Sequence, residues 1–435
     1  MTATRILLIG GGYVGLYTAL RLEHQLTGAE AEITMVDPEN FMVYRPLLAE
    51  VASGTLEPRH AVVPLRGVLR RTRIITGRLT TVDTAEQVAT VVPYDGERLR
   101  LPYDHIVVGV GAMAKLLPVP GLAESGIGFN SVAEAMYLRD HVLRELETAA
   151  SSTSPERRRK ALTFVFVGGG YTGVEALAEL QDMAGNVLSG YPELRPDELR
   201  WVLVEAQDRI LNTVAPSLAE HALRELRDRG IEVRLGTRLD SALDGVAVLS
   251  DGTRLPTDTL VWVTGTKPNR VVTDAGLPAD EKGRIPVDEF LRARGGTGIW
   301  AAGDCAAVPD LRSKGKKGLC PPTAQYAVRQ ANALGDNLVA VVRGRSPRPF
   351  RYRNRGEFVT LGRHKAVGDM LGVKVTDLPA WVARRLYYLS QIPTWNRRLR
   401  ISADWLIGLP FRHDVINLGS REQPRAAFED AARVD

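Results

Sequence analysis

Short apolar runs that lead into glycine-rich turns recur along the chain. Arg5–Ile9 and Phe164–Val167 are largely apolar, and each is followed by glycines and then by a segment with helical periodicity. Such runs predict buried strands, and the segments behind them, Tyr13–Leu26 and residues 171–180, predict helices. By contrast, the alternation of apolar and polar residues across Arg73–Leu101 predicts β-hairpins. Together these patterns predict an α/β fold.

The remaining periodic segments continue the succession of strands and helices. The further predicted strands are Glu32–Val36, Tyr103–Gly111, Trp201–Val204, Thr259–Thr264 and Gly298–Ala302. The further predicted helices are Ser131–Ala149, Leu218–Arg229 and Pro321–Val342, the last with proline at its start, where the missing N–H costs little. A chain of 435 residues is too long for one ordinary core, so two or three domains are expected.

The first glycine-rich turn has the spacing of a dinucleotide-binding motif. Gly10, Gly12 and Gly15 form G-x-G-x-x-G between a predicted strand and a predicted helix. The first glycine permits a tight turn, the second lets a pyrophosphate approach the backbone, and the third lets helix and strand pack closely. Asp37 ends the next strand, 22 residues after Gly15, where a carboxylate can accept hydrogen bonds from ribose hydroxyls. The alternative is a glycine-rich turn with an incidental acid, which the complete order of elements disfavours.

The same motif occurs a second time, within Thr163–Leu180. Gly168, Gly170 and Gly173 stand between a strand and a helix, and Glu205 ends the strand that follows. Two copies predict two bound dinucleotides, or one duplicated fold with an idle copy, and an acid after each copy favours two working sites. Glu205 favours NADH over NADPH, because a carboxylate accepts from the 2′-hydroxyl and repels a 2′-phosphate, although Arg209 lies close by.

The order of the motifs predicts that one domain interrupts the other. The first dinucleotide domain resumes late in the chain with Ile299–Asp304, a strand that ends in a carboxylate. This layout suggests a flavin in the outer domain and a nicotinamide in the inserted one. The chemistry that it permits is hydride transfer from a reduced nicotinamide to a stacked flavin.

The amino-acid composition limits the compartment and the partners that we expect for this protein. The two cysteines, Cys305 and Cys320, exclude a disulfide framework and suit a reducing compartment. We expect no signal peptide and no spanning helix, because no apolar run is long enough.

Arginine and lysine crowd positions 311–317 and 343–400, which favours nucleic acid or an anionic membrane as a partner. Within Pro379–His413, the residues Ile401, Trp405 and Leu409 share one helical face, which suits either a membrane interface or packing on the chain's own domain or a dimer partner.

These residues resemble the type II NADH:quinone oxidoreductases, the non-proton-pumping members of the two-dinucleotide flavoprotein superfamily. The superfamily resemblance covers Arg5–Val342 and rests on GGGYVG with Asp37, VGVGA at Val108–Ala112, VTGTKPN at Val263–Asn269 and AAGDCA at Ala301–Ala306. The narrower resemblance rests on YRPLLAEVASG at Tyr44–Gly54, VEAQDRIL at Val204–Leu211, PPTAQYAVRQ at Pro321–Gln330, FVTLGRHKAV at Phe358–Val367 and the C-terminal Trp/Arg/Tyr segment.

The resemblance implies two Rossmann-like domains, the second inserted in the first, and a C-terminal amphipathic helical membrane-association segment. Residues 1–116 and 286–345 are then expected to bind FAD, 117–285 to bind NADH, and 346–435 to form a β-segment and a membrane-associating or dimerisation region. The implied reaction passes a hydride from NADH to non-covalent FAD and two electrons to menaquinone or ubiquinone, without proton pumping. The implied setting is a peripheral homodimer on the cytoplasmic face of the inner (plasma) membrane, with an anionic membrane surface and no nucleic acid as partner.

Site residues follow from the same resemblance. It assigns to FAD Gly10, Gly12, Gly15, Asp37, Gly111, Asp304 and Ala324, with Asp304 on the ribityl chain and a helix start at Pro321 directed at the flavin. It assigns to NADH Gly168, Gly170, Gly173, Glu205 and Gly265, and it implies no metal. Gln325 and Gln330 would contact the quinone or only orient the flavin. Glu175 would relay protons or help to dock NADH, unless it is simply a favourable acid in the first turn of its helix.

Four rival activities are weaker interpretations. A flavin disulfide reductase needs a cysteine pair after the first acid, and positions 38–60 contain no cysteine. A sulfide:quinone oxidoreductase calls for better-placed thiols than Cys305 and Cys320. A ferredoxin-reductase-like flavoprotein ends in a β-rich domain rather than in a Trp/Arg tail. A redox-sensing binding protein would not need both motifs intact.

Overall fold

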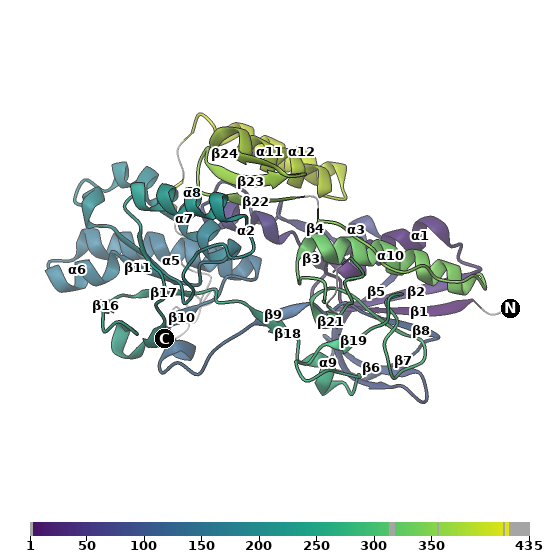
Figure 1. The fold of residues 1–435 in the computed structure, drawn as a ribbon. Helices are drawn as coiled ribbons and strands as arrows, with labels where there is room; N and C mark the ends of the chain where they lie inside the picture. Colours follow the sequence, from purple (N-terminus) through teal and green to yellow (C-terminus); the bar gives the residue numbers. More distant parts are fainter. Residues whose placement is uncertain (1–2, 313–317, 355, 412–413, 417–435) are drawn as a thin grey trace, which may run out of the picture. The chain divides into compact units, whose positions relative to one another are not determined.

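The computed structural model describes residues 3–312, 318–354, 356–411 and 414–416. Most of the basic run at 311–317, His413 and the end of the predicted C-terminal region from residue 417 lie outside the described residues. The chain forms two compact units (Figure 1). Unit 1 consists of residues 1–43, 62–113 and 266–354, and unit 2 consists of residues 44–61, 114–265 and 355–435.

A seven-stranded sheet forms the centre of unit 1, in the order β20-β8-β1-β2-β5-β6-β7. β1 (Thr4–Ile9) pairs in parallel with β2 (Ala31–Asp37) and with β8 (His105–Val108). On its far side β8 pairs in parallel with β20 (Ile299–Ala301). From Ile6 onward the side chains of β1 are buried, as expected for a parallel strand that is covered on both faces.

Two helices from opposite ends of the sequence lie side by side in unit 1. Figure 1 shows α1 (Tyr13–Gln25) next to α10 (Ala324–Val342), both along one side of the sheet. The Arg21 guanidinium on α1 forms an ion pair with Asp336 on α10, with the Nε atom 2.7 Å from Oδ1. The other elements of unit 1 are β3 (Phe41–Val43), β4 (Val62–Pro64), α3 (Leu65–Val68), β5 (Arg73–Asp83), β6 (Val88–Pro93), β7 (Leu99–Pro102), β9 (Ala112–Ala114), β18 (Thr266–Pro268), α9 (Val271–Asp274), β19 (Ile285–Pro286), the 3₁₀ turn η5 (Gly303–Cys305) and β21 (Ala306–Ala307).

Unit 2 repeats the strand–turn–helix–strand arrangement on a five-stranded sheet in the order β10-β17-β11-β12-β13. β11 (Thr163–Val167) pairs in parallel with β12 (Arg200–Val204) and with β17 (Thr259–Trp262), and α7 (Tyr171–Val187) follows β11. The other elements of this part are α2 (Leu48–Ala52), α4 (Leu122–Ser125), β10 (Gly126–Ile127), α5 (Val132–Ser151), α6 (Pro155–Ala161), α8 (Pro216–Asp228), β13 (Glu232–Arg234), β14 (Leu239–Ser241), β15 (Val246–Leu249) and β16 (Arg254–Pro256).

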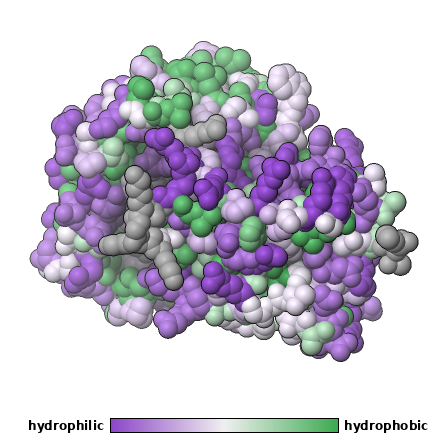
Figure 2. All heavy atoms as spheres, turned by 45° about the vertical axis from the view of Figure 1, so that its right-hand side comes forward, coloured by the Kyte–Doolittle hydropathy of each residue, from purple (hydrophilic) through white to green (hydrophobic). Residues whose placement is uncertain are grey.

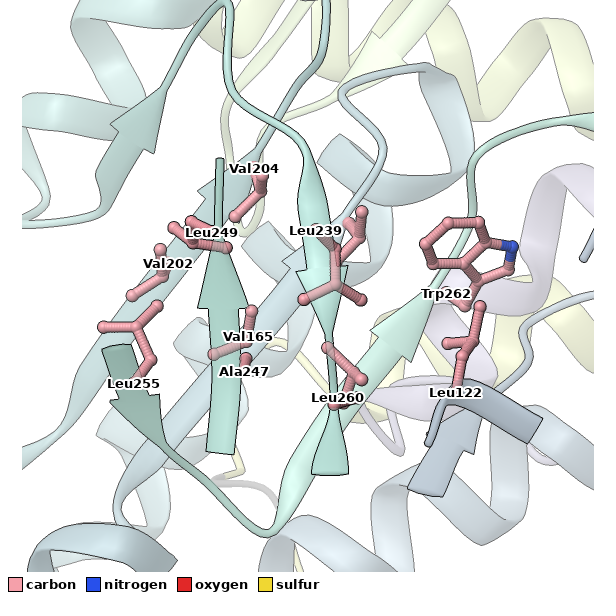
Figure 3. Close-up of a cluster of buried hydrophobic side chains, with 12 residues drawn as sticks. Leu122, Val165, Val202, Val204, Leu239, Ala247, Leu249, Leu255, Leu260 and Trp262 are labelled. Carbon is pink, nitrogen blue, oxygen red and sulfur yellow. The ribbon is translucent and has the colours of Figure 1, made fainter. Parts of the chain in front are cut away.

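A second, smaller sheet closes one face of the five-stranded sheet. Figure 3 shows side chains of the two sheets gathered in one apolar cluster. Val165, Val202 and Val204 come from the large sheet, and Leu249 and Leu255 come from the antiparallel sheet β14-β15-β16. All five are buried, so this core fixes the strands that lead into the second glycine-rich turn.

The C-terminal part of unit 2 contains three antiparallel strands and two helices. The strands are β22 (Gly356–Thr360), β23 (Ala366–Met370) and β24 (Val373–Thr376), and they are followed by α11 (Asp377–Gln391) and α12 (Trp395–Ile407). Ala380 and Trp381 of α11 are buried against Ala366 of β23. None of the helices in the described part of the chain has the length and apolar character needed to cross a membrane.

Two sequence predictions need correction. The helix predicted from Pro321 begins at Ala324, because the Thr323 side chain caps it by accepting a hydrogen bond from the Tyr326 N–H. The predicted face of Ile401, Trp405 and Leu409 does not continue as one face, since α12 ends at Ile407. Its first two members are buried, and Leu409 is exposed. The first two side chains therefore pack within the chain's own fold, which is the alternative left open above.

Candidate functional sites

The first glycine-rich turn has the shape of a phosphate cradle. Gly10 has φ +101°, and a Cβ atom there would lie 2.6 Å from the carbonyl oxygen of Gly109. A Cβ atom on Gly15 would lie 1.8 Å from the carbonyl oxygen of Gly10. A Cβ atom on Gly12 would have none of the described atoms within 4 Å of it. Two positions thus require glycine for packing, and the middle one leaves open space beside the start of α1.

The second turn reproduces this geometry in unit 2. Gly168 has φ +118°, and a Cβ atom there would lie 2.6 Å from the carbonyl oxygen of Val263. A Cβ atom on Gly173 would lie 1.9 Å from the carbonyl oxygen of Gly168, whereas one on Gly170 would meet no described atom within 4 Å. The chain therefore contains two cradles of equal construction, each of which fits the pyrophosphate of a dinucleotide.

Each cradle has its acid in the same place. The Asp37 carboxylate accepts a hydrogen bond from the N–H of Gly11, and its other oxygen accepts one from Glu39, at 2.7 Å. The Glu205 carboxylate accepts from the N–H of Gly169 at 2.6 Å and from Gln207 at 2.8 Å. Burial raises the pKa of Asp37 above its ordinary value. Both acids lie beside the turn, where the ribose of a dinucleotide would offer its hydroxyls.

The carboxyl ends of β1, β8 and β20 bring the remaining predicted flavin residues to one edge of unit 1. Gly111, with φ +65°, follows β8, and Asp304, which is half-buried, follows β20. These strands are neighbours in a parallel sheet, so Asp304 and Gly111 share this edge with Gly10. Ala324 begins α10. These residues fit a flavin dinucleotide, with the start of α10 three residues later than the sequence predicted.

The two predicted quinone glutamines differ in their environment. The Gln330 side chain is 2% exposed, and its Oε1 atom accepts a hydrogen bond from the N–H of Gly303 at 2.8 Å. Gln325 is half-buried in the first turn of α10. Gln330 therefore holds the turn that carries Asp304, which supports the alternative of an orienting amide for this residue. Gly265, predicted to contact NADH, has φ +115° and follows β17 at the edge that carries Gly168.

Glu175 belongs to a buried charge cluster that the sequence patterns did not reveal. It lies one turn later in α7 than predicted, since the helix begins at Tyr171 and its first turn contains no acid. One Glu175 oxygen accepts the backbone N–H of Thr360 at 2.9 Å and lies 3.2 Å from the Nη2 atom of Arg384. The Arg384 guanidinium also donates to Glu50 at 2.7 Å. Stabilisation of the helix dipole is therefore not the main role of Glu175.

The electrostatics of this cluster are dominated by burial. Arg384 is 1% exposed and Glu50 is 2% exposed. Burial raises the pKa of the Glu175 carboxyl, although Arg384 acts in the opposite direction. Glu179, one turn further along α7, has its pKa raised to about 7 by burial and by the neighbouring carboxylates. Sequence spacing could have linked only Glu175 to Glu179, as i and i+4 on one helix face.

The two cysteines are not joined in a disulfide. Cys305 and Cys320 are free thiols, and Cys305 is buried. Burial raises the pKa of Cys305 to about 12 and that of Cys320 to about 11. Both are therefore protonated near neutral pH, and the thiolate that sulfide or disulfide chemistry requires is disfavoured.

Comparison with known proteins agrees with this geometry. Residues 4–331 match the family model described as pyridine nucleotide-disulphide oxidoreductase. The chain is 30% identical to a demethylphylloquinone reductase from Synechocystis, over 92% of this chain and 95% of that protein. It is 29% identical to a type II NADH:quinone oxidoreductase from Mycobacterium tuberculosis, over 93% of this chain and 87% of that one.

A solved structure shares the fold at greater sequence distance. The Plasmodium falciparum protein named NDH2, solved in complex with NADH, has a TM-score of 0.88 at 18% identity and covers 95% of this chain and 99% of its own. The resemblance to type II NADH:quinone oxidoreductases predicted from the motifs is thus confirmed. With three quarters of its length matched by the family model, the chain belongs to the pyridine nucleotide-disulphide oxidoreductase family.

Proposed function

We propose that this chain is an NADH:quinone oxidoreductase that holds FAD in unit 1 and binds NADH in unit 2. The observation that carries the proposal is the pair of glycine-rich turns. In each turn the first and third glycines of the motif leave no space for a Cβ atom, whereas the middle glycine has open space beside it. FAD, when bound, supplies the chemistry that accepts a hydride from NADH and passes two electrons to a quinone. The relatives named above as quinone reductases support a quinone as the acceptor.

The residues of this chain bind and orient the two nucleotides. The open positions at Gly12 and Gly170 admit the pyrophosphates, and the N–H groups at the starts of α1 and α7 bind their charge. Asp37 and Glu205 accept hydrogen bonds from ribose, and Glu205 selects NADH over NADPH. Gln330 positions the turn of Asp304 beside the flavin, and Gln325 is the candidate for direct quinone contact.

The C-terminal helices are proposed to associate with an anionic membrane, as a peripheral anchor on its cytoplasmic face. Several large apolar side chains of α11 and α12 are exposed, among them Leu386 at 62%, Trp395 at 70% and Leu406 at 67%. Figure 2 shows apolar residues gathered at the upper edge, where Figure 1 has α11 and α12. Exposed apolar side chains next to arginines suit a membrane interface. A homodimer is part of the same proposal, to be tested by the mass of the purified protein in solution.

The function is tested with the purified holoprotein under anaerobic conditions. It should contain non-covalent FAD, and NADH should bleach the flavin in one fast phase. Menaquinone and ubiquinone analogues should then restore the flavin absorbance, and the faster one identifies the quinone class. Bleaching by sulfide but not by NADH would favour a sulfide:quinone oxidoreductase, and reoxidation only by an iron–sulfur protein would favour a ferredoxin-reductase-like enzyme.

Membrane association is tested by point substitution, because α12 buries Ile401 and Trp405 and cannot be deleted without opening unit 2. Leu386→Glu combined with Leu406→Glu should lower binding to anionic vesicles while flavin bleaching by NADH stays unchanged. Leu243→Glu is the matched control, since Leu243 is 53% exposed on unit 2 but lies outside α11 and α12. Equal vesicle binding by all variants would refute the anchor.

A further inference from the structure

Helix α7 carries three acids on one face. Glu175, Glu179 and Asp182 are spaced by four and three residues, which places their side chains along the same side of the helix. Glu179 is only 6% exposed. Glu175 and Asp182 are partly exposed. Carboxylates are seldom buried unless they are paired with a cation or perform chemistry, so Glu179 needs an explanation.

The two outer acids are paired with arginines, and the middle one is not. Asp182 forms an ion pair with Arg229, with Oδ1 2.7 Å from Nη2, and Glu175 pairs with Arg384. Within the described residues Glu179 forms no ion pair, and the Thr360 hydroxyl donates a hydrogen bond to its Oε1 atom at 2.8 Å. A neutral donor compensates a buried charge less than a guanidinium does, so Glu179 is the member of the row that can change its protonation state near neutral pH.

A cavity of about 560 Å³ in unit 2 reaches this middle acid. Glu179 and Asp182 line its wall, together with the indoles of Trp381 and Trp405. Exposed Phe411 also lines it, so the cavity opens to the surface. Glu175 is not among the lining residues. Water in the cavity can therefore bring protons to Glu179, which is the neighbour of Glu175 on α7.

Thr360 holds the two glutamates next to each other. Its backbone N–H donates to Glu175 at 2.9 Å, and its hydroxyl donates to Glu179. Side chains four residues apart on a helix have Cβ atoms about 5–6 Å apart, so the two carboxyl groups are within reach directly or through one water. The row thus leads from the open cavity back towards the glycine-rich start of α7.

We propose that Glu179 is a proton-relay residue, which takes up a proton from water in this cavity and passes it to Glu175. The inference rests on the proposed function, because reduction of a quinone by NADH consumes one proton: NADH, H⁺ and quinone give NAD⁺ and quinol. A proton moves from hydronium to the Glu179 carboxylate and then to the Glu175 carboxylate. Glu175 then gives this proton to the reduction of the quinone, which consumes it. Both carboxylates are thereby restored as anions, and the proton transfers themselves need no oxidant or reductant.

Other charged groups around Glu179 set its response to pH. From the elements packed around it, these are Glu50 on α2, Glu175 and Asp182 on α7, Arg384 and Arg385 on α11, and Arg363 and His364 between β22 and β23. Burial lowers the pKa of His364, so this imidazole is neutral in the range where Glu179 titrates. The acids raise the proton affinity of Glu179, and Arg384 lowers it.

The test separates the two half-reactions by anaerobic stopped-flow spectroscopy. In Glu179→Gln the bleaching of flavin by NADH should stay unchanged, and reoxidation by quinone should slow by about 100-fold. The wild-type reoxidation rate should fall as pH rises through about 7, and the variant should lack this pH dependence. Its solvent isotope effect should change as well, because another proton donor becomes rate-limiting. Glu179→Asp, which keeps an acid, should recover part of the rate.

The matched control is Glu145→Gln. Glu145 is 5% exposed on α5 and its pKa is also raised by burial, but it does not line the cavity, so its variant should keep the wild-type pH profile.

If Glu179→Gln does not retain FAD, Thr360→Val serves instead: loss of the hydroxyl donor should move the pH dependence to higher pH. Wild-type reoxidation with an unaltered pH profile in Glu179→Gln, or in Thr360→Val where that variant is used, would overturn the relay. Failure of the wild type to reduce any quinone would instead overturn the proposed function.

Discussion

Replacing Arg384 by methionine removes the cation that three segments of unit 2 share. The guanidinium on α11 donates to Glu50 on α2 at 2.7 Å and to the carbonyl oxygen of Pro46 at 2.8 Å. It also lies 3.2 Å from Glu175 on α7 and 5.0 Å from the centre of the Tyr388 ring. Methionine fills a similar length of the site but leaves both carboxylates without their cation.

The expected loss of stability follows from the burial of these groups. Removal of one partner from a buried ion pair costs about 3–5 kcal/mol, because the remaining charge stays desolvated. Arg384 and Glu50 are 1% and 2% exposed, so solvent screening gives little relief. We therefore expect Arg384→Met to lower the free energy of unfolding of unit 2 by about 3–5 kcal/mol near neutral pH.

The loss should depend on pH in a defined direction. Burial already raises the pKa of Glu175 in the folded protein, and without Arg384, which opposes this shift, the pKa rises further above its unfolded value. The folded variant then binds more protons than the unfolded chain, so its stability increases as pH falls towards the unfolded pKa. The difference from wild type should therefore shrink as pH falls from neutrality towards the ordinary pKa of a glutamate.

Urea unfolding followed by tryptophan fluorescence measures this difference. Trp405 reports on the cluster directly, since its indole N–H donates to Glu50. Glu50→Gln in the Arg384→Met background should recover part of the loss, because one uncompensated charge is removed. Arg400→Met on the exposed side of α12 is the control and should change stability by less than about 0.5 kcal/mol. A loss below about 1 kcal/mol for Arg384→Met, or one independent of pH, would refute the reasoning.

Three further predictions follow from the cradles and from α7. Gly173→Ala places a Cβ atom 1.9 Å from the Gly168 carbonyl oxygen and should abolish flavin bleaching by NADH, whereas Gly170→Ala should keep the fold and weaken NADH binding, as measured by KM. Glu205→Ala should shift the ratio of kcat/KM for NADH and NADPH towards NADPH by about tenfold, and an unchanged ratio would contradict the ribose assignment. The pKa of Glu179 is raised from 4.5 to about 7, so wild-type stability should fall by about 3 kcal/mol as pH rises across that window, and Glu179→Gln should flatten this dependence in urea titrations.

The two cradles could be predicted from sequence because their determinants are local. Gly10 and Gly15 are separated by one turn and the first residues of one helix, and the carbonyl that excludes a Cβ atom at Gly15 belongs to Gly10 itself. Asp37 ends the next strand in a parallel pair, so register alone brings it to the turn. Short-range spacing, strand periodicity and the requirement for glycine are therefore sufficient to predict this part of the site.

The charge cluster could not be predicted because its members are distant in sequence. Glu50 and Arg384 are 334 positions apart, and Glu50 and Trp405 are 355 positions apart. No periodicity in the sequence could predict contacts between residues that are so far apart along the chain. For the same reason the pattern of α12 was ambiguous: an apolar face with Ile401 and Trp405 fits a lipid surface or a protein core equally well, and only the position of Glu50 decides where the Trp405 indole points.

The contacts of α7 explain why the C-terminal segment is an integral part of unit 2 rather than a detachable anchor. The glycine-rich turn for which we propose NADH binding leads into this helix, and one side of the helix carries Glu175, Glu179 and Asp182. Two of the residues that hold this acidic face in place come from the C-terminal part of the chain: Thr360 donates hydrogen bonds to Glu175 and Glu179, and Arg384 forms an ion pair with Glu175. Acids that are largely withdrawn from water on one face of a helix would be destabilising without these partners. The C-terminal helices are therefore required to keep α7 folded and its acids in their protonation states, whether or not a membrane is bound.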